Sequence, residues 1–284
     1  MQEEPDIVCF GAAHWDVIAR IEGAAQGADT PGRVERRPGG VALNVARALA
    51  AAGCRATLVA PLGDDEAGER LRAALKEDEI ATEGLLVRNG APTGCYVAIE
   101  RADGELLAAV ADAAALDALT PAALPLDRHL AAQAWFLETN LPVPVIKALA
   151  ERPERPALVA DAVSQAKAPK LRPILDRLAT LYCNRAEAEA ICTTGFEAAA
   201  AAAGALVELG AARAVVTDGP HAAADAGRHG VTALRPADGG LRSVTGAGDA
   251  LLAAHLTATL RGGDAETALA AGLAAARRHS ACPW

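Results

Sequence analysis

Short apolar segments that end in glycine or polar residues recur along this chain, and they restrict its possible folds more than any other feature. The clearest of them lie within 6–11, 56–63, 134–142, 157–164, 178–187 and 214–219. Continuous apolar runs of this kind are typical of strands buried on both faces, as in a parallel sheet. Segments with helical periodicity follow several of them, which indicates βαβ units. We therefore predict an α/β fold with a mainly parallel central sheet.

Polar residues stand just beyond the ends of these expected strands. Asp16 follows the first strand, Asn140 and Lys167 follow two strands in the middle of the chain, and Asn184 and Glu187 follow a later one. Open α/β sheets bind their ligands outside the carboxyl ends of the strands. The row of polar residues therefore predicts one binding crevice, although each of them alone is equally typical of a solvated turn.

A glycine pair opens the first expected helix. Residues 41–52 place their larger apolar side chains on one helical face, and Gly53 is typical of the position that ends a helix. Gly39 and Gly40 precede this helix, and Asn44 lies one turn into it. Backbone amides and an amide side chain at a helix start are suited to binding sugar hydroxyl groups. These three residues are therefore candidate sugar ligands.

An antiparallel hairpin interrupts the alternation of strands and helices. Asp103 and Gly104 separate two apolar segments, 93–100 and 105–110. Asp-Gly between such segments is a strong hairpin signal. Antiparallel insertions beside an α/β sheet often form a lid over the site, and we expect one here.

A glycine-rich turn at 243–250 leads directly into an apolar helix. Gly246 and Gly248 let the backbone approach a ligand closely, and the first amides of the helix form a site for anions such as phosphate. Asp249 would repel a phosphate, so it is better explained as a general base that takes a proton from an attacking hydroxyl. An ordinary helix N-cap is the alternative for this segment alone. His255, further along the helix, is interpreted as structural.

Composition limits the class of partner. The 284 residues carry a net charge of −9 with no evident basic face, which argues against binding to a nucleic-acid polymer. The N-terminus has no signal-peptide pattern and no apolar run is long enough to cross a bilayer, so we expect a cytoplasmic protein with no membrane partner. The six cysteines form no CxxC pair and are expected to be reduced and buried.

Four motifs resemble those of the ribokinase-like (PfkB-type) carbohydrate kinases. Residues 39–46 resemble the N-terminal signature of that family, and residues 245–249 resemble its C-terminal signature. Residues 184–187 resemble its Asn-x-x-Glu motif, and residues 217–219 resemble its nucleotide-binding turn. Their order and spacing agree with the family, so the resemblance covers nearly the whole chain.

The resemblance implies both the fold and the reaction. The fold would be the ribokinase-like three-layer α/β/α sandwich. It would form a single kinase domain over residues 1–284, with a small β-sheet lid formed by insertions at about 13–38 and 90–112. The reaction would be transfer of the ATP γ-phosphoryl group to a hydroxyl of a small sugar or nucleoside. ATP and Mg²⁺ are the implied cofactors, and the resemblance leaves open whether a monovalent cation such as K⁺ is also used. A homodimer through the lid is implied by analogy.

The resemblance also implies a role for each matching residue. Asp249 would be the general base, and the amides of Gly246, Ala247 and Gly248 would form the anion hole. The implied substrate ligands are Asp16, Gly39, Gly40, Asn44, Asn140 and Lys167. The implied nucleotide ligands are Asn184, Glu187, Thr217 and Gly219, and Glu187 would also organise Mg²⁺ through water.

Within the family, three stretches resemble the pseudouridine kinase branch. They are residues 30–33, 139–142 and 161–167. They favour pseudouridine as the phosphate acceptor, with pseudouridine 5′-phosphate as the product. Kinases for other acceptors, such as ribose, adenosine-like nucleosides or fructose phosphates, are the alternatives.

The chain departs from the family pattern at four positions. Ser243 stands where an acidic residue is usual, and Ala222 stands where the nucleotide turn has a second glycine. Leu43 replaces a common arginine, and Glu138 replaces an aspartate. These departures bear on metal handling and substrate choice. Those at Ser243 and Ala222 also keep open a non-catalytic sugar or nucleoside sensor on the same fold. A nicotinamide dehydrogenase is disfavoured, because Gly11 does not begin a Gly-x-Gly-x-x-Gly motif.

Overall fold

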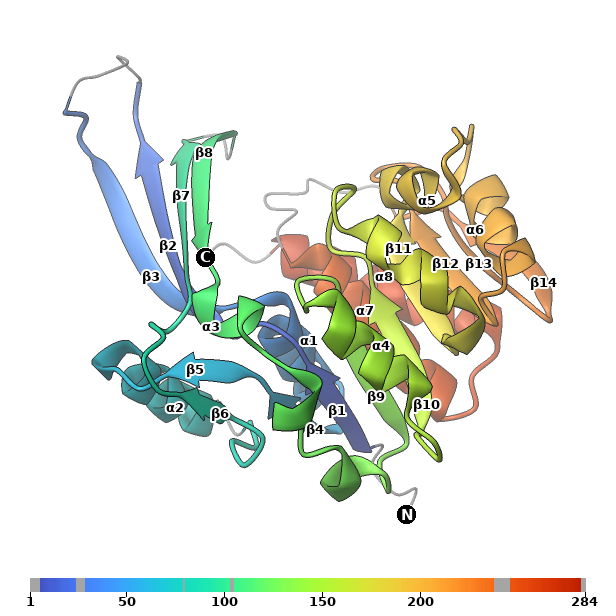
Figure 1. Cartoon of the computed structure of the whole chain (residues 1–284). Helices are drawn as coiled ribbons and strands as arrows, with labels where there is room; N and C mark the ends of the chain where they lie inside the picture. The colour runs from blue at the N-terminus through green and yellow to red at the C-terminus, as the bar shows by residue number, and fades with distance from the viewer. Residues whose placement is uncertain (1–5, 24–28, 79, 103–104, 238–245, 282–284) are drawn as a thin grey trace.

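The computed structural model describes residues 6–23, 29–78, 80–102, 105–237 and 246–281. Eight strands form the central sheet: β1 (Asp6–Phe10), β4 (Arg55–Val59), β9 (Ala134–Glu138), β10 (Ala157–Asp161), β11 (Thr180–Asn184), β12 (Arg213–Thr217), β13 (Ala223–Gly227) and β14 (Gly230–Leu234). Their order is β14-β13-β12-β11-β10-β9-β1-β4 (Figure 1). Neighbouring strands from β4 to β12 are parallel, and only β13 and β14 pair antiparallel. The predicted mainly parallel sheet is confirmed.

Helices cover both faces of this sheet (Figure 1). One layer contains α1 (Val41–Ala51), α7 (Ala247–Leu260) and α8 (Ala265–Ala281), and the other contains α4 (Val143–Glu151), the 3-10 helix η3 (Ala168–Arg177), α5 (Arg185–Cys192) and α6 (Ala199–Glu208). Ile7 and Cys9 of β1 are buried against the first layer, and Val8 and Phe10 are buried against the second. Because both faces are covered, consecutive residues inside such a strand are apolar, and the sequence shows continuous runs. The structure therefore has the three-layer α/β/α architecture.

A second sheet of four strands projects from the main body (Figure 1). It contains β2 (His14–Ile21), β3 (Gly32–Gly39), β7 (Cys95–Arg101) and β8 (Leu106–Asp112), in the order β3-β2-β7-β8. β3 pairs antiparallel with β2 and β8 with β7, whereas β2 and β7 are parallel. The predicted hairpin is thus confirmed as β7 and β8, and its turn residues Asp103 and Gly104 lie outside the described residues. That this sheet acts as a lid stays a prediction.

The prediction of one continuous strand over residues 56–63 is wrong. β4 ends at Val59, and Pro61–Gly63 forms a separate short strand, β5, which pairs with β6 (Leu86–Arg88) in a two-stranded sheet. Proline has no amide hydrogen to donate to a β-ladder, so the pairing with β1 stops before Pro61. The remaining elements are α2 (Glu66–Glu77), α3 (Ala114–Asp117), η1 (Pro121–Ala123) and η2 (Leu126–His129).

The cysteines of the described residues are all free thiols. Cys9, Cys54 and Cys183 are buried as expected, but Cys95 and Cys192 are partly exposed, so the expectation of uniform burial is wrong. Cys95 begins β7 in the projecting sheet, which has no helical layer over its outer face to bury it. Within the described ranges, no helix combines the length and the apolar composition that crossing a membrane requires.

Candidate active site

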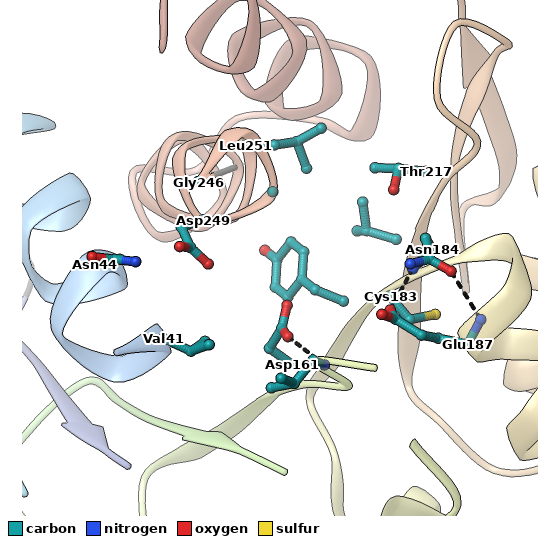
Figure 2. A pocket seen from close by; sticks show the side chains of 14 residues that line it. Val41, Asn44, Asp161, Cys183, Asn184, Glu187, Thr217, Gly246, Asp249 and Leu251 are labelled. Atoms are coloured by element: carbon teal, nitrogen blue, oxygen red, sulfur yellow. Dashed lines mark hydrogen bonds between the residues drawn. The ribbon is translucent and has the colours of Figure 1, made fainter. Parts of the chain in front are cut away.

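A cavity of about 380 Å³ lies at the carboxyl ends of three parallel strands, β10, β11 and β12. Its walls are formed by Val41, Asn44, Asp161, Val163, Tyr182, Cys183, Asn184, Glu187, Val215, Thr217, Gly246, Gly248, Asp249 and Leu251. Figure 2 shows Asn44 and Asp249 on one side of the cavity and Asn184, Glu187 and Thr217 on the other. Four predicted motifs thus meet in one place: the two signatures, the Asn-x-x-Glu motif and the nucleotide turn. This place is the edge formed by the carboxyl ends of the strands, where open α/β sheets bind their ligands.

The N-terminus of α7 forms one wall of this cavity. Gly246 is its N-cap residue, in the left-handed region with φ 82°, and a Cβ there would lie only 2.6 Å from Nε2 of His279. A side chain at this position would be strained by the left-handed backbone and would displace the His279 ring, so the position favours glycine. A Cβ on Gly248 would meet nothing within 4 Å. Gly248 and Asp249, in the first turn of α7, line the cavity, and the N-terminus of a helix favours an anion.

Asp249 lies in the first turn of α7 and is half-buried in the cavity. The Asn44 side chain, on α1, hydrogen-bonds to its carboxylate. Burial raises the pKa of Asp249 to about 7, nearby Glu138 adds to the rise, and the bond from Asn44 opposes it. A carboxyl group whose pKa is close to the working pH can both accept and release a proton, which is what a general base requires.

Asp161 is a further carboxylate of the cavity, and the sequence analysis did not select it. It is the last residue of β10, and the amide of Val163 donates to its Oδ1 at 2.7 Å. Val163 has φ 60°, a conformation that β-branched residues rarely adopt and that is often found at functional sites. Burial, followed by the charges of Asp249 and Glu187, raises the pKa of Asp161 well above its usual range. Its place at a strand end was a signal available in the sequence.

Asn184 and Glu187 form a reciprocal cap at the start of α5. The amide of Glu187 donates to Oδ1 of Asn184 at 2.9 Å, and the amide of Asn184 donates to Oε2 of Glu187 at 2.8 Å (Figure 2). Glu187 is only 7% exposed, and burial raises its pKa. The Asn-x-x-Glu spacing is therefore also a capping box, which fixes both side chains in the cavity wall.

Three of the expected substrate ligands, Asp16, Gly39 and Gly40, lie at the base of the projecting sheet. They are not among the described residues that line the cavity. The Asp16 carboxylate, on β2, lies 3.2 Å from Nδ1 of His14 and 3.8 Å from Nε of Arg37. A Cβ on Gly39 would overlap this carboxylate. Gly40 has φ 105°, and a Cβ there would overlap the carbonyl of residue 12. The two glycines thus let α1 begin directly beside Asp16.

Asn140 and Lys167 form a second polar group, linked to Asp249 through Glu138. The Asn140 side chain accepts a hydrogen bond from the Lys167 ammonium group. The fully buried Glu138 carboxylate accepts from the amides of Ala12 at 2.8 Å and Asn140 at 2.5 Å. Burial raises the pKa of Glu138, and its charge in turn raises the pKa of Asp249. Glu138, which stands where the family usually has an aspartate, thus places a buried carboxyl group near Asp249, the expected base.

The last expected nucleotide ligand, Gly219, lies in the turn after β12 with φ 56° and open space beside it. Ala222 follows in the same connection, whereas Ser243 and Thr245 lie outside the described residues. A second cavity, of about 470 Å³, lies between the end of β14 and α8. Its lining includes Arg235, Arg277 and Arg278. The sequence analysis missed this group, because arginines at a helix end resemble an ordinary solvated face.

The carboxylates of the cavity are the groups that a metal ion bound together with a nucleotide would face. Among the described residues, no group of three or more His, Cys, Asp or Glu side chains is arranged to hold a metal ion. Asp161, Glu187 and Asp249 nevertheless supply oxygen atoms of the kind that Mg²⁺ prefers. Burial is the main cause of their raised pKa values, and for Asp161 the charges of the other two carboxylates add to the rise. A cation there would oppose this rise, with phosphate oxygens and water as its other ligands.

Comparisons with known proteins agree with this geometry. The model of the pfkB family of carbohydrate kinases matches residues 4–278. The chain is 29% identical to pseudouridine kinase of Escherichia coli (strain K12) over 262 residues, which are 89% of this chain and 83% of the relative. Among solved structures, a carbohydrate kinase from Agrobacterium tumefaciens has a TM-score of 0.81 and 31% identity, and covers 96% of this chain and 89% of its own.

A ribokinase from Arabidopsis thaliana, solved with ribose and ATP, shares the fold at a TM-score of 0.80 and 22% identity, over 96% of this chain and 92% of its own. The family match spans almost the entire chain and includes every motif on which the resemblance was based. This chain is therefore a member of the PfkB family of carbohydrate kinases, and it is a sugar or nucleoside kinase with the ribokinase-like fold.

Proposed function

We propose that this kinase phosphorylates pseudouridine at its 5′-hydroxyl, with Mg²⁺-bound ATP as the phosphoryl donor. One observation supports the chemistry above all others: Asp249, with a pKa of about 7, stands in the same helical turn as the candidate anion-hole amides. The acceptor is supported by the similarity to pseudouridine kinase of Escherichia coli over 89% of the chain. The three stretches that resemble that branch, residues 30–33, 139–142 and 161–167, add to this support.

Each step of the proposed transfer has a candidate residue. Asp249 takes the proton of the acceptor hydroxyl as the new oxygen–phosphorus bond forms and the bond to the ADP oxygen breaks. The amides of residues 246–248 stabilise the charge on the transferred group. Bound Mg²⁺ would neutralise charge on the phosphates, with Glu187 holding it through water. Asn184 and Thr217 line the nucleotide side of the cavity, and Gly219 lies in the turn that follows Thr217. The arginines of the second cavity add positive potential along the same sheet edge.

We propose that the projecting sheet is the lid of this single domain and closes over the acceptor. Asp16 on β2 and Gly39 on β3 lie where that sheet meets α1, so closure would bring Asp16 toward the sugar. Val17, Val97 and Val110 lie opposite one another on three neighbouring strands, and Val97 and Val110 are 41% and 69% exposed. Exposed apolar rows of this kind favour pairing with a second copy, which is the proposed homodimer.

ADP release with ATP, Mg²⁺ and a panel of acceptors tests the proposal. The panel contains pseudouridine, uridine, cytidine, adenosine, ribose and fructose 6-phosphate. We expect turnover with pseudouridine to exceed that with the other acceptors by at least about tenfold. Turnover that is highest with another acceptor would contradict the acceptor but not the kinase chemistry. A folded protein that binds ATP and turns over none of them would favour the sensor alternative.

Replacing Asn44 by alanine is expected to raise the KM of the acceptor by about tenfold while the KM of ATP changes less than about twofold. The reason is that Asn44 projects from α1 on the side of the cavity away from Asn184 and Thr217 (Figure 2). Steady-state kinetics with each substrate varied in turn measure both constants. An equal rise in both KM values would contradict the assignment of Asn44 to the sugar.

The pH dependence of kcat/KM is expected to report Asp249. The base must be unprotonated to act, and burial raises its pKa to about 7, so kcat/KM should fall as pH decreases through about 7 and level off above it. In Asn44→Ala the bond that lowers this pKa is lost, and the midpoint should move to higher pH. A profile that is flat between pH 5.5 and 8.5 would contradict a base with this pKa.

A further inference from the structure

A buried chain of polar side chains joins the floor of the active-site cavity to the helix that carries Asp249. The Tyr182 hydroxyl, on β11, lies 2.7 Å from Nδ1 of His255 on α7. Nε2 of His255 lies 3.1 Å from Oδ2 of Asp225 on β13. Arg213 on β12 binds both carboxylate oxygens of Asp225, its Nε at 2.7 Å from Oδ1. His255 and Asp225 are completely buried, and Tyr182 is 3% exposed.

The protonation states of this chain follow from its contacts. Hydrogen bonds and charge from Arg213 and His255 hold the pKa of Asp225 below its usual range, against the opposing effect of burial. Burial lowers the pKa of His255 and raises that of Tyr182, so both are neutral. A neutral imidazole beside an ionised carboxylate carries its proton on the nitrogen that faces the carboxylate. Nε2 of His255 lies 3.1 Å from Oδ2 of Asp225 and 3.3 Å from Nη2 of Arg213. We assign Nε2–H as the donor to the nearer carboxylate oxygen, and the Tyr182 hydroxyl as the donor to Nδ1.

The chain fixes α7 against three strands of the sheet at once. His255 is six residues after Asp249, fewer than two helical turns along α7. Arg213 also donates to Oγ1 of Thr259 on the same helix at 3.1 Å. β11 and β12, which carry Tyr182 and Arg213, end in the nucleotide-side residues Asn184 and Thr217. The same bonds thus set the position of the base and anion-hole amides relative to the strand ends opposite them.

We propose that Tyr182 and His255 are positioning residues of the phosphoryl transfer. Their hydrogen bond, anchored by Asp225 and Arg213, holds the first turn of α7 in register with the nucleotide side of the cavity. This inference rests on the proposed function, because it assigns the residues an effect on that reaction. In-line transfer depends strongly on alignment, and a misplacement of about 1 Å can cost roughly 100-fold in rate.

Three variants test the proposal. Tyr182→Phe removes the hydroxyl but keeps the ring in the cavity wall. His255→Gln keeps an amide N–H that can donate to Asp225 and removes the ring Nδ1 that accepts from Tyr182. Thr257→Val is the matched control: Thr257 is buried on the same helix and bonds to Cys54 Sγ at 3.1 Å and to the carbonyl of Ala253 at 2.7 Å, outside the chain of bonds. Circular dichroism and the melting temperature establish that each variant is folded.

We expect Tyr182→Phe and His255→Gln each to lower kcat by about tenfold or more, with both KM values within about twofold of wild type. The double variant should lose no more than the stronger single one, because both remove the same bond. Thr257→Val should keep kcat within about twofold even if its melting temperature falls equally. Full activity of Tyr182→Phe, multiplied losses in the double variant, or an equal loss in the control would each overturn the proposal.

A measurement on the wild-type protein keeps the proposal testable if the variants do not fold. Nitrogen-15 NMR of the histidine side chains, with the His255 signals assigned by their absence in His255→Gln or by contacts to α7, should show the neutral Nε2–H form. An Nδ1–H form or a charged ring would overturn the bonding pattern. Absence of wild-type turnover with every acceptor would instead overturn the proposed function, whereas wild-type turnover together with a fully active Tyr182→Phe would overturn only this inference.

Discussion

Replacing Asp249 by asparagine is expected to lower kcat by roughly 10³-fold, within the range typical of a lost general base. Asparagine keeps the size of the side chain and can still bond to Asn44, but it cannot accept the proton of the acceptor hydroxyl. Binding of ADP should change little, because the anion-hole amides belong to the backbone. Steady-state ADP release with the best acceptor and calorimetric titration with ADP measure the two effects.

The same variant should be more stable than the wild type at pH 8. Burial raises the pKa of Asp249 to about 7, so its charged form is less favourable in the folded than in the unfolded state, and this cost grows as pH rises from about 4 to 7. Removing the charge should raise the melting temperature at pH 8 and have less effect at pH 5. Asp176→Asn, at an exposed position, is the control for both measurements. Turnover of Asp249→Asn within tenfold of wild type would remove Asp249 as the base.

Replacing Arg213 by methionine is expected to lower the free energy of unfolding by about 3–5 kcal/mol. Asp225 is completely buried, and Arg213 binds both of its carboxylate oxygens. Without the guanidinium group, the carboxylate keeps only its histidine partners, His255 and the more distant His229 at 3.6 Å, to offset its burial. Urea denaturation at pH 8, followed by circular dichroism, measures the loss.

The destabilisation caused by Arg213→Met is also expected to depend on pH in a defined direction. The pKa of Asp225 is lowered in the folded protein, so its charged form contributes stability above its unfolded pKa, and this contribution is lost as pH falls through the lowered value. The difference between Arg213→Met and wild type should therefore persist down to about pH 4 and shrink as pH falls further. Arg70→Met is the control, because Arg70 pairs with Glu66 on an exposed surface and should cost less than about 1 kcal/mol. An equally small effect of Arg213→Met would show that Asp225 does not depend on this pair.

The fold could be predicted to the extent that burial on two faces leaves a mark in the sequence. The continuous apolar runs of β1, β9, β10, β11 and β12 indicate strands that are buried on both faces. The β7–β8 hairpin was predicted from a different signal, the Asp-Gly pair between two apolar segments. The single strand expected at 56–63 was wrong, because an apolar run does not reveal which partner each part pairs with. Pro61 was the local signal for that break. The partial exposure of Cys95 likewise depends on a sheet that projects away from the helices, which residue type alone does not indicate.

The candidate site was predictable where chemistry is local in sequence. Asp249 and the amides beside it come from one turn, and Asn184 with Glu187 comes from another. Asp161 needed knowledge that its strand lies next to those that end at the cavity. The partners of His255 are Tyr182, 73 residues away, and Asp225, 30 residues away, and no periodicity in the sequence links them. His255 was interpreted as structural from its place in a helix. Its hydrogen bonds show what it holds together, namely α7 and the strands that carry Tyr182 and Asp225.

The reciprocal cap of Asn184 and Glu187 has a consequence for how this site can change over time. Each residue holds the other in place, starts α5, and forms part of the cavity wall. A substitution at either position would be selected against twice, once through folding and once through the proposed role in nucleotide handling. A drift in metal or nucleotide preference in this lineage is therefore expected to begin elsewhere in the cavity, at residues such as Asp161 or Thr217 that do not also cap a helix.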